Sequence, residues 1–412
     1  MRIGIIGAGA AGMMAAATIL ESGADTVVTL IEKNAVIGRK VVISGGGRCN
    51  VTTGLRDLKK VLTRYPRGEK FLRHAMYEFT PERVYEWFER HGVPLKIEDD
   101  LRAFPRSNDG HDVVGVFEKI FAGAGNRLKL VLKCSVQKVA RREDGVFLVE
   151  LQDGKNFEFD RLILTTGGQA YRFTGSTGDG YEFAEALGHT VGQLAPSLNS
   201  FLLDEEWPKQ LAGLSRPNAR LRARFEDRKY EFSGPLMFTH KGLTGPAVFA
   251  LSSLVAFEKY DKTTPLLLNL DFFPEVPEEE LRARLESLIK ENQRKSLQNT
   301  LAFLVPKSLS EQICIVCDLS PELKNMDVGK KIINKLINVL KNAEFKVVGR
   351  GAGDEFVTAG GVNLQEVDPK TMESKICPGL YFAGEILDVD GFTGGFNLQA
   401  SWATGRLCGR SV

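Results

Sequence analysis

Net charge is almost absent from this sequence, and so is any long hydrophobic run. Its 54 Lys and Arg residues nearly balance 52 Asp and Glu residues, for a formal net charge of +2. This argues against the overall basic field that nucleic-acid-binding proteins use. No apolar stretch is long enough to span a bilayer, and the first residues predict a buried strand in place of a signal peptide. We therefore expect a cytoplasmic protein with a small-molecule substrate and no membrane or nucleic-acid partner; the oligomeric state stays open.

Cysteine is sparse as well, with six residues scattered along the chain. A disulfide scaffold is not expected, because 412 residues are enough to build a hydrophobic core. Only Cys314 and Cys317 have CxxC spacing, and they follow a predicted capping box from Ser308 to Glu311. Three positions apart on a helix, they are predicted to be small core residues, since no βαβ unit surrounds them as a redox motif requires. No metal site is predicted.

Glycine is plentiful, but its 42 residues gather mainly towards the two ends of the chain. The strand and helix patterns of those ends predict an α/β fold, with one Rossmann-type dinucleotide-binding domain assembled from residues 1–190 and 346–412. Residues 191–345 are predicted to be an inserted domain, β-rich with a helical portion. The expected elements include strands at 2–6 and 26–31 flanking a helix from Ala11 to Glu21, a hairpin at 218–225 and 229–232, and insert helices at 277–292, 308–318 and 328–341.

The turn between the first strand and the first helix carries a GxGxxG motif. Gly7 allows a tight turn, Gly9 lets the backbone approach a pyrophosphate, and Gly12 lets helix and strand pack closely. Glu32, at the end of the second strand, is placed to accept hydrogen bonds from ribose hydroxyls. The motif predicts dinucleotide binding without separating FAD from NAD. The alternative is a tight turn that binds no ligand.

A second glycine-rich segment follows this unit. Ser44-Gly-Gly-Gly47 runs into Arg48-Cys49-Asn50, which gives a stretch nearly free of side chains that can wrap an anionic or planar ligand. Arg39, Lys40 and Arg48 are candidates for neutralising phosphate charge. The alternative is a mobile surface loop whose charges are solvated.

Two later glycine turns complete the set. Thr166-Gly167-Gly168 ends a predicted buried strand, although turn chemistry alone accounts for such a run. Near the C-terminus, Gly384-Glu385 is followed by Gly394-Gly395 and a helix expected from Asn397 to Leu407. The N-terminus of that helix would stabilise negative charge that develops near flavin N1 on reduction. A nicotinamide develops no such anion, so this feature favours FAD.

These motifs resemble the BaiN/YhiN-type family of FAD-dependent oxidoreductases, also called aminoacetone oxidase-like, over nearly the whole chain. The resemblance implies a glutathione-reductase-like FAD domain interrupted by a β-barrel-like and helical insert. It rests on the first glycine motif with Glu32-Lys33, Gly38-Arg39-Lys40, Ser44 to Asn50, Thr166 to Gly168, Thr177 to Gly180, Phe238 to Gly242 and Gly384 to Gln399.

Two departures from better-known relatives limit the chemistry. Cys49 is alone where disulfide reductases place a cysteine pair, so dithiol chemistry is not expected. The sequence also has no second complete GxGxxG, since Gly349 to Gly353 lacks the context and spacing of that motif. NADH or NADPH, as an electron donor, would therefore bind transiently to another surface.

Two sets of candidate site residues follow. The catalytic candidates are His240, Tyr171 and Arg172. His240 is a candidate general acid or base because of its residue type and its place in the run Thr239 to Gly242, but the alternative is that it shapes a turn before a helix begun by Pro246. Tyr171 and Arg172 follow Gly168, and their alternative is ordinary loop residues. The cofactor-binding candidates are Gly7, Gly9, Ala11, Gly12, Glu32, Lys33, Gly38, Arg39, Lys40, Ser44, Gly46, Gly47, Arg48, Cys49, Asn50, Val136, Thr166, Gly167, Gly168, Gly384, Glu385, Asp388, Gly395, Phe396, Asn397, Leu398 and Gln399.

The favoured function is an FAD-dependent oxidoreductase that transfers hydride between flavin and a small organic substrate. In the reductive direction it would reduce an activated C=C bond with NADH or NADPH as donor, as the resemblance implies. Two alternatives stay open: an FAD-dependent oxidase of small amines or ketones, and a flavin-binding RNA-associated or regulatory protein. The even charge balance weighs against the RNA alternative.

Overall fold

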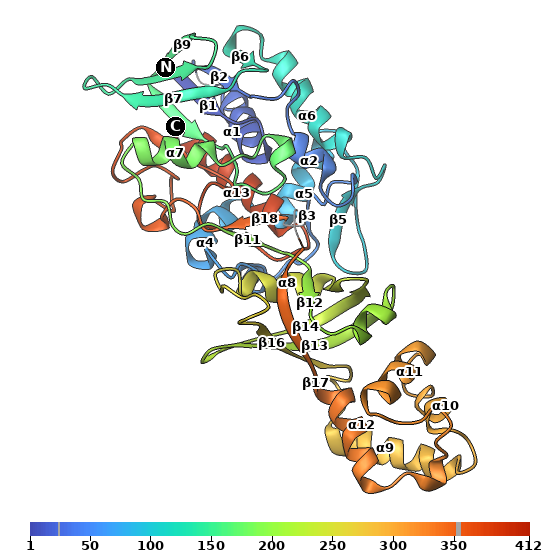
Figure 1. Cartoon of the computed structure of the whole chain (residues 1–412). Helices are drawn as coiled ribbons and strands as arrows, with labels where there is room; N and C mark the ends of the chain where they lie inside the picture. The colour runs from blue at the N-terminus through green and yellow to red at the C-terminus, as the bar shows by residue number, and fades with distance from the viewer. Residues whose placement is uncertain (24, 352–355) are drawn as a thin grey trace. The chain divides into compact units, whose positions relative to one another are not determined.

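The computed structural model describes residues 1–23, 25–351 and 356–412, and the chain divides into two units (Figure 1). Unit 1 contains Met1–Ser197 and Phe356–Val412, and unit 2 contains Leu198–Glu355. The sequence predicts the two domain boundaries at residues 191 and 346. The second boundary lies later because β17 (Ala343–Arg350) pairs with two strands of unit 2. Gly353, in the run that was judged not to be a second glycine motif, lies outside the described residues.

Unit 1 is built on a five-stranded parallel sheet with strand order β19-β10-β1-β2-β6. Ile5 in the central strand lies opposite Leu30 on one side and Ile163 on the other, and all three are fully buried. Continuous apolar strands of this kind are typical of parallel sheets covered on both faces. The strands are β1 (Arg2–Ile6), β2 (Val27–Ile31), β6 (Leu128–Val131), β10 (Arg161–Leu164) and β19 (Leu380–Phe382).

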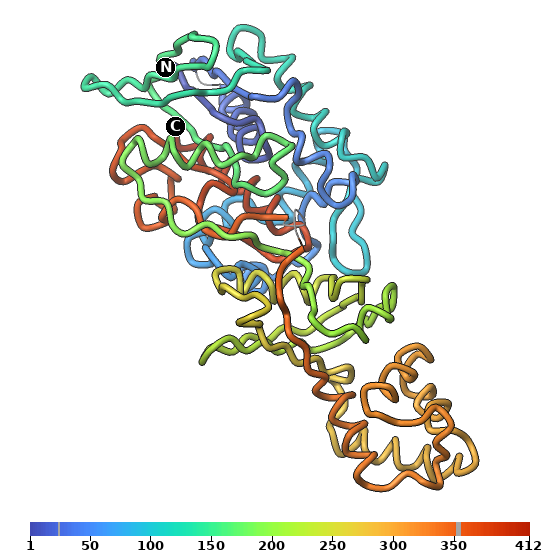
Figure 2. Tube along the Cα trace, viewed as in Figure 1, coloured from blue at the N-terminus to red at the C-terminus, as the bar shows by residue number. Residues whose placement is uncertain are grey.

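Two helices from opposite ends of the chain lie side by side in unit 1, as Figure 2 shows in blue and red. They are α1 (Ala10–Glu21) and α13 (Phe396–Ser411). Their backbones touch at glycines of α13: a Cβ on Gly405 would lie 2.4 Å from the carbonyl oxygen of Ala11, and one on Gly409 would lie 2.6 Å from that of Ala15. This contact joins the N-terminal and C-terminal parts of unit 1.

Smaller elements surround the sheet. Helix α5 (Pro81–Arg90) has a typical start, with Thr80 Oγ1 accepting from the Arg83 amide at 3.1 Å and Pro81 in the first turn. The other helices of unit 1 are α2 (Arg39–Ile43), α3 (Leu58–Leu62), α4 (Glu69–Glu78), α5 (Pro81–Arg90), α6 (Gly110–Gly123) and α7 (Asp179–Ala186), with 3-10 turns η1 (Gly125–Arg127), η2 (Arg172–Thr174) and η5 (Leu364–Glu366). The minor sheets are β3 (Thr52–Thr53), β5 (Arg102–Pro105) and β4 (Leu95–Ile97); β7 (Val136–Arg141), β8 (Phe147–Leu151) and β9 (Asn156–Phe159); and β11 (Ala195–Ser197) with β18 (Val357–Ala359).

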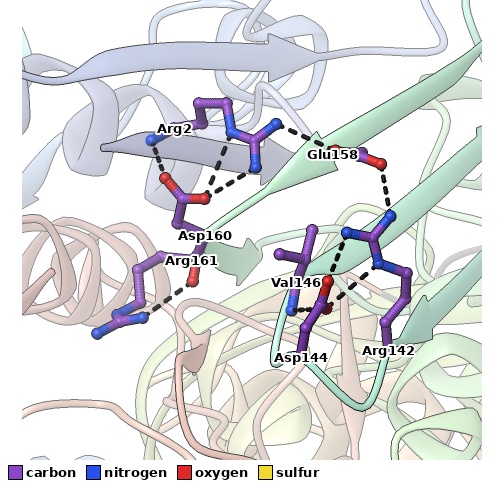
Figure 3. Close-up of polar contacts among 7 residues, drawn as sticks. All are labelled: Arg2, Arg142, Asp144, Val146, Glu158, Asp160 and Arg161. Carbon is purple, nitrogen blue, oxygen red and sulfur yellow. Dashed lines mark hydrogen bonds and ion pairs between the residues drawn. The ribbon is translucent and has the colours of Figure 1, made fainter.

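A polar network ties the β7-β8-β9 sheet to the start of β1 (Figure 3). Arg2 donates to Asp160 at 2.9 Å and to Glu158 at 3.3 Å, and Arg142 donates to the other oxygen of Glu158 at 2.6 Å. The Arg2 guanidinium and the Arg2 amide together lower the pKa of the Asp160 carboxyl. These side chains are well exposed, so the network orients the sheet edge more than it stabilises the fold.

Unit 2 contains a closed six-stranded barrel with strand order β12-β15-β14-β13-β16-β17. The predicted hairpin is confirmed but longer than expected, because β13 and β14 pair from Phe225 and Arg228 back to Ser215 and Met237. Along β13, Leu221 and Ala223 are buried, and Arg222 and Arg224, which alternate with them, face outward. The strands are β12 (Phe201–Leu203), β13 (Ser215–Phe225), β14 (Arg228–Thr239), β15 (Gly242–Thr244), β16 (Leu266–Asp271) and β17 (Ala343–Arg350).

The helices of unit 2 follow the predicted pattern, with one correction. The capping box at Ser308–Glu311 is wrong: α11 begins at Lys307, Pro306 is its N-cap, and no side chain caps it. Pro306 supplies the extended residue before the helix. Within the helix, Ser310 Oγ donates to the carbonyl of Lys307. Cys314 and Cys317 are buried core residues, as expected. The helices are α8 (Pro246–Leu254), α9 (Glu278–Glu291), α10 (Leu297–Leu301), α11 (Lys307–Val316) and α12 (Lys330–Asn342), with η3 (Trp207–Leu211) and η4 (Asn325–Asp327).

The α1–α13 contact predicts the effect of adding a single methyl group. Gly405→Ala should lower the free energy of unfolding by about 1–3 kcal/mol, because the new Cβ would overlap the backbone of Ala11. Gly115→Ala is the matched control inside α6, where nothing lies within 4 Å of the new Cβ; alanine there should raise stability by roughly 0.5–1 kcal/mol. Denaturant unfolding of both variants measures the difference, and equal stability of the two would contradict the close contact.

Candidate functional site

The three glycines of the first motif serve different purposes. Gly7 has a φ of 102°, and a Cβ there would lie 2.6 Å from the carbonyl oxygen of Thr165. A Cβ on Gly12 would lie 1.9 Å from the Gly7 carbonyl oxygen, so glycine at both positions is required by the fold itself. At Gly9, in contrast, nothing lies within 4 Å of an added Cβ. The N-terminus of α1 therefore faces open space, as an anion-binding turn must.

The first helical bond of α1 runs from the Met13 amide to the Gly9 carbonyl at 2.9 Å. The amides of residues 10–12 thus have no partner within the helix and carry its partial positive charge. Ala11, one of the candidates, contributes one of these amides and packs its Cβ 2.8 Å from the position that a Cβ on Gly384 would take. The arrangement suits a pyrophosphate.

Glu32 is buried at the end of β2 and already holds the neighbouring turn. One carboxylate oxygen accepts from the Ala8 amide at 2.8 Å, and the other accepts from the amide and side chain of Asn34 at 2.8 and 2.7 Å. A carboxylate offers about four acceptor sites, so this geometry leaves capacity for one hydroxyl donor. Lys33 turns away and forms an ion pair with Asp179 at 2.7 Å.

The backbone after β6 runs along the same end of the sheet. The Glu32 amide donates to Val131, and the Cys134 amide donates back to Glu32. Val136 begins β7 two residues later and is buried. The structure therefore brings Val136 close to Glu32 in space, although a hundred residues separate them in the sequence.

The second glycine segment forms α2 and the turn after it. Gly38 has a φ of 64° and donates to the Ala8 carbonyl at 2.8 Å, which docks the segment on the first motif. Arg39 reaches the side-chain oxygen of Asn34 at 3.3 Å. Gly46 and Gly47 have positive φ and no atom within 4 Å of an added Cβ. Like Gly9, each of these two glycines therefore leaves backbone that a ligand can approach.

The charged and thiol side chains of that segment are mostly committed to protein contacts. Arg48 forms an ion pair with Glu98 at 2.7 Å and lies 3.7 Å above the ring of Phe104, so its charge is already balanced without a phosphate. Ser44 Oγ donates to the Val41 carbonyl at 2.8 Å. Cys49 is fully buried, and burial raises the pKa of its thiol to about 12. A thiol in that state is not a nucleophile at neutral pH.

Lys40 is also paired within the protein, but its partner comes from the opposite end of the chain. Its ammonium lies 2.7 Å from Glu385, whose other oxygen accepts from the Thr358 amide at 2.9 Å. Thr358 Oγ1 in turn accepts from the Gln169 amide at 2.7 Å. A Cβ on Gly168 would lie 2.4 Å from this hydroxyl oxygen, so the Gly168 turn is held against β18 and Glu385.

Several buried polar atoms near this turn have no partner among the described residues. They are Thr166 Oγ1, Tyr181 hydroxyl and Asp388 Oδ1. Burial raises the pKa of Asp388, and the charge of Asp390 adds to the effect. Gly167 has a φ of 75° and keeps the backbone beside them. Buried polar atoms are almost always hydrogen-bonded in native proteins, so these atoms indicate a ligand or ordered water.

Helix α13 is positioned by side chains that were expected to bind the cofactor. Asn397 closes the preceding loop by exchanging hydrogen bonds with the backbone of Gly391 at 2.8 and 2.7 Å. Gln399 is fully buried between Thr52 and the Phe79 carbonyl, at 2.6 and 2.8 Å. These residues thus orient the helix instead of presenting their side chains to a ligand.

The remaining C-terminal candidates leave the backbone as the contact surface. Phe396 packs its ring 6.1 Å from that of Tyr65, whose hydroxyl donates to the Phe396 carbonyl. Gly395 has a φ of 87°, and a Cβ there would lie 2.3 Å from the Thr52 carbonyl oxygen. With its side-chain amide in the orientation that satisfies both of its groups, Asn50 accepts from the Gly395 amide at 2.9 Å. The amides of residues 396–398, including Leu398, are then the ones left for a ligand.

The three catalytic candidates fall in different units, with Tyr171 and Arg172 in unit 1 and His240 in unit 2. His240 is exposed in the turn between β14 and β15 of unit 2, where Thr239 Oγ1 accepts from the amides of Lys241 and Gly242. This geometry agrees with the alternative in which the run Thr239 to Gly242 shapes a turn. Arg172 is exposed and donates to Gln169 at 3.0 Å. Tyr171 has a φ of 55°, and its ring packs 5.8 Å from Phe173.

One ion pair beside the candidate site was missed by sequence reasoning. Arg67 and Asp390 are 2.5 Å apart, Asp390 is fully buried, and Ser197 donates to the same carboxylate at 2.8 Å. The Asp-x-Asp spacing of Asp388 and Asp390 is a sequence feature that marks this segment, but nothing in the sequence indicates Arg67 as the partner of Asp390.

Comparison with known proteins identifies the family of this chain. Residues 1–411 match the family model described as the HI0933-like protein Rossmann domain. The chain belongs to this family. The result confirms the family recognised from the motifs, the Rossmann-type fold and the general class of FAD-dependent oxidoreductase. No helix among the described residues is long and apolar enough to cross a membrane.

Two curated relatives match almost end to end. The chain is 30% identical to a 3-dehydro-bile acid delta(4,6)-reductase of Clostridium scindens, over 100% of this chain and 98% of that protein. It is 31% identical to a ribosomal RNA dihydrouridine synthase of Escherichia coli, over 99% of this chain and 97% of that protein. Among solved structures, a 3-ketosteroid delta1-dehydrogenase from Sterolibacterium denitrificans has the same fold, with a TM-score of 0.50, 13% identity and coverage of 99% and 98%.

Gly9 gives a test that separates ligand binding from folding. Gly9→Asp places a favourable N-cap residue in open space, so the free energy of unfolding of the protein without cofactor should stay equal or rise. FAD affinity should fall at least about a hundredfold, since like charges near 4 Å cost roughly 4 kcal/mol at a protein surface.

Gly9→Asn is the matched control of the same size without the charge, and it should weaken FAD binding less. Titration of FAD into the three proteins at two salt concentrations measures the difference, which should shrink at high salt. If Gly9→Asp bound FAD as tightly as the wild type, the pyrophosphate would not lie at the N-terminus of α1.

Proposed function

We propose that this chain is an FAD-dependent reductase that adds hydrogen across a C=C bond conjugated to a carbonyl group. The observation that carries the proposal is the start of α1, where the amides of residues 10–12 have no partner within the helix and nothing lies within 4 Å of a Cβ added on Gly9. FAD, when bound, supplies the redox chemistry: its reduced form gives a hydride to an electron-poor carbon, and the neighbouring carbon takes a proton.

The reactions named for the two curated relatives support this choice of bond. A 3-dehydro bile acid with delta(4,6) unsaturation has C=C bonds conjugated to its 3-oxo group. Formation of dihydrouridine saturates the C5=C6 bond of uracil, which is conjugated to the C4 carbonyl. The two substrates differ in size and polarity, yet the bond reduced is of the same electronic type. We therefore assign the bond type to this chain and treat the carrier of that bond separately.

Residues of unit 1 would hold the cofactor in an extended form. The amides of residues 10–12 would bind the pyrophosphate, and the remaining acceptor capacity of Glu32 would take a ribose hydroxyl. The Lys40–Glu385 pair keeps the Gly168 turn and the C-terminal segment together around the middle of the site. The unpartnered Thr166 and Asp388 oxygens would receive the polar groups of the cofactor or water between them.

The first residues of α13 would face the flavin ring. Their free amides favour negative charge, so they stabilise the reduced form more than the oxidised form. Arg48 and Cys49 fix the end of the second glycine segment to the protein, through the Glu98 ion pair and complete burial. The donor is NADH or NADPH, which would reduce the flavin and leave before the acceptor binds, because the sequence has no second dinucleotide-binding motif.

The test is an anaerobic assay of both half-reactions. NADH or NADPH should bleach the flavin absorbance of the purified FAD-loaded protein, and addition of a suitable acceptor should restore it. Acceptors to compare are a 3-oxo-delta(4) steroid and a uridine-containing RNA, each against its saturated analogue, and the product should gain two hydrogen atoms by mass spectrometry. Reoxidation by neither acceptor, combined with amine- or ketone-dependent oxygen consumption, would overturn the proposal in favour of an oxidase.

A further inference from the structure

Two large apolar side chains in the helical part of unit 2 are exposed to solvent. Phe303, after α10, is 60% exposed, and Met326, in η4, is 63% exposed. Three cations, Arg294, Lys295 and Lys324, are exposed around them. We call these five residues the cation–aromatic patch. It takes no part in the candidate FAD site, which is formed by residues of unit 1.

Backbone contacts place the members of the patch side by side. Ser296 and Lys324 form an antiparallel bridge, and the Asn325 amide donates to the Lys295 carbonyl at 3.1 Å. The Lys295 ammonium lies 5.1 Å from the centre of the Phe303 ring. The two segments and the ring therefore share one surface.

The patch is held from beneath by one buried side chain. Asn325 is 2% exposed, and its side-chain nitrogen donates to the Asn292 carbonyl at 2.8 Å and to Thr300 Oγ1 at 2.7 Å. These bonds connect the end of α9, helix α10 and η4. A surface ordered in advance loses less entropy when a partner binds.

The local charge differs from that of the whole chain. Residues 290–335 contain eight Lys or Arg against five Asp or Glu, although the whole chain is nearly neutral. None of the three patch cations lies within 4 Å of a described carboxylate, whereas Arg282 and Arg284 on α9 both pair with glutamates. The nearest acids in sequence are Glu291, whose carboxylate accepts from Ser287, and Asp327.

We infer that the cation–aromatic patch binds an unpaired segment of RNA. An exposed aromatic ring beside unpaired cations matches how proteins hold single strands, with a base stacked on the ring and phosphates on Lys and Arg. A duplex would not offer its bases to Phe303, because they are stacked inside it. The inference rests on the proposed function and deepens it by naming the carrier of the reducible bond: a uracil base in RNA.

The test measures binding of a fluorescently labelled, U-rich single-stranded RNA to the FAD-loaded full chain. Phe303→Ala should weaken binding about 5- to 150-fold, the range for loss of one base stack, and Phe303→Trp should restore it. The Lys295→Gln, Lys324→Gln double variant should reduce the slope of log affinity against log salt by about 1.4. Ile376→Ala and Lys262→Gln are the controls, an exposed apolar residue of unit 1 and an exposed cation away from the patch, and both should bind like the wild type.

Reduction of a free 3-oxo-delta(4) steroid separates this inference from the proposed function. Phe303→Ala should leave that rate unchanged while RNA binding falls. If no acceptor is reduced but RNA binding still depends on Phe303, the proposed function fails and the inference stands. RNA binding that is unaffected by the patch variants, or patch-dependent binding of anionic lipid vesicles without any of RNA, would overturn the inference.

Discussion

The close contact between α1 and α13 is the constraint on which unit 1 depends. Alanine side chains on α1 and glycines on α13 remove the bulk that normally separates helices, so the two backbones touch at Gly405 and Gly409. Helix axes usually lie 8–10 Å apart, with side chains between them. Here the backbone contact fixes how far one helix can slide along the other, and it thereby fixes both ends of the candidate site.

The offset between the two helices suits an extended dinucleotide. Gly405 lies at the level of Ala11, and α13 has nine residues ahead of Gly405 whereas α1 has one ahead of Ala11. At 1.5 Å per residue, the eight-residue difference carries the start of α13 about 12 Å beyond the start of α1. Two clusters of free amides are therefore separated along one line, one suited to a pyrophosphate and the other to a flavin ring. Asn397 and Gln399 hold the second cluster in place through contacts within the protein.

Local features of this fold could be predicted from the sequence, and long-range pairs could not. The strand–helix–strand opening, the Thr80–Pro81 helix start and the barrel hairpin follow from patterns within a few residues. The local pattern predicts Arg48 as a partner of phosphate, yet the charge of Arg48 is balanced by Glu98, which lies fifty residues away in the sequence. The Arg67–Asp390 pair spans most of the chain and has no local signal. The motif assigns an open position to Gly9 and a closely packed one to Gly12, and the structure has that same difference at these two positions.

A crystal structure of the FAD-loaded protein tests the central claim most directly, namely that the two ends of the chain make one cofactor site. The account predicts the pyrophosphate within hydrogen-bonding distance of the amides of residues 10–12, and the flavin ring beside the amides at the start of α13. FAD bound by the N-terminal residues alone, with the start of α13 in contact only with protein, would contradict it.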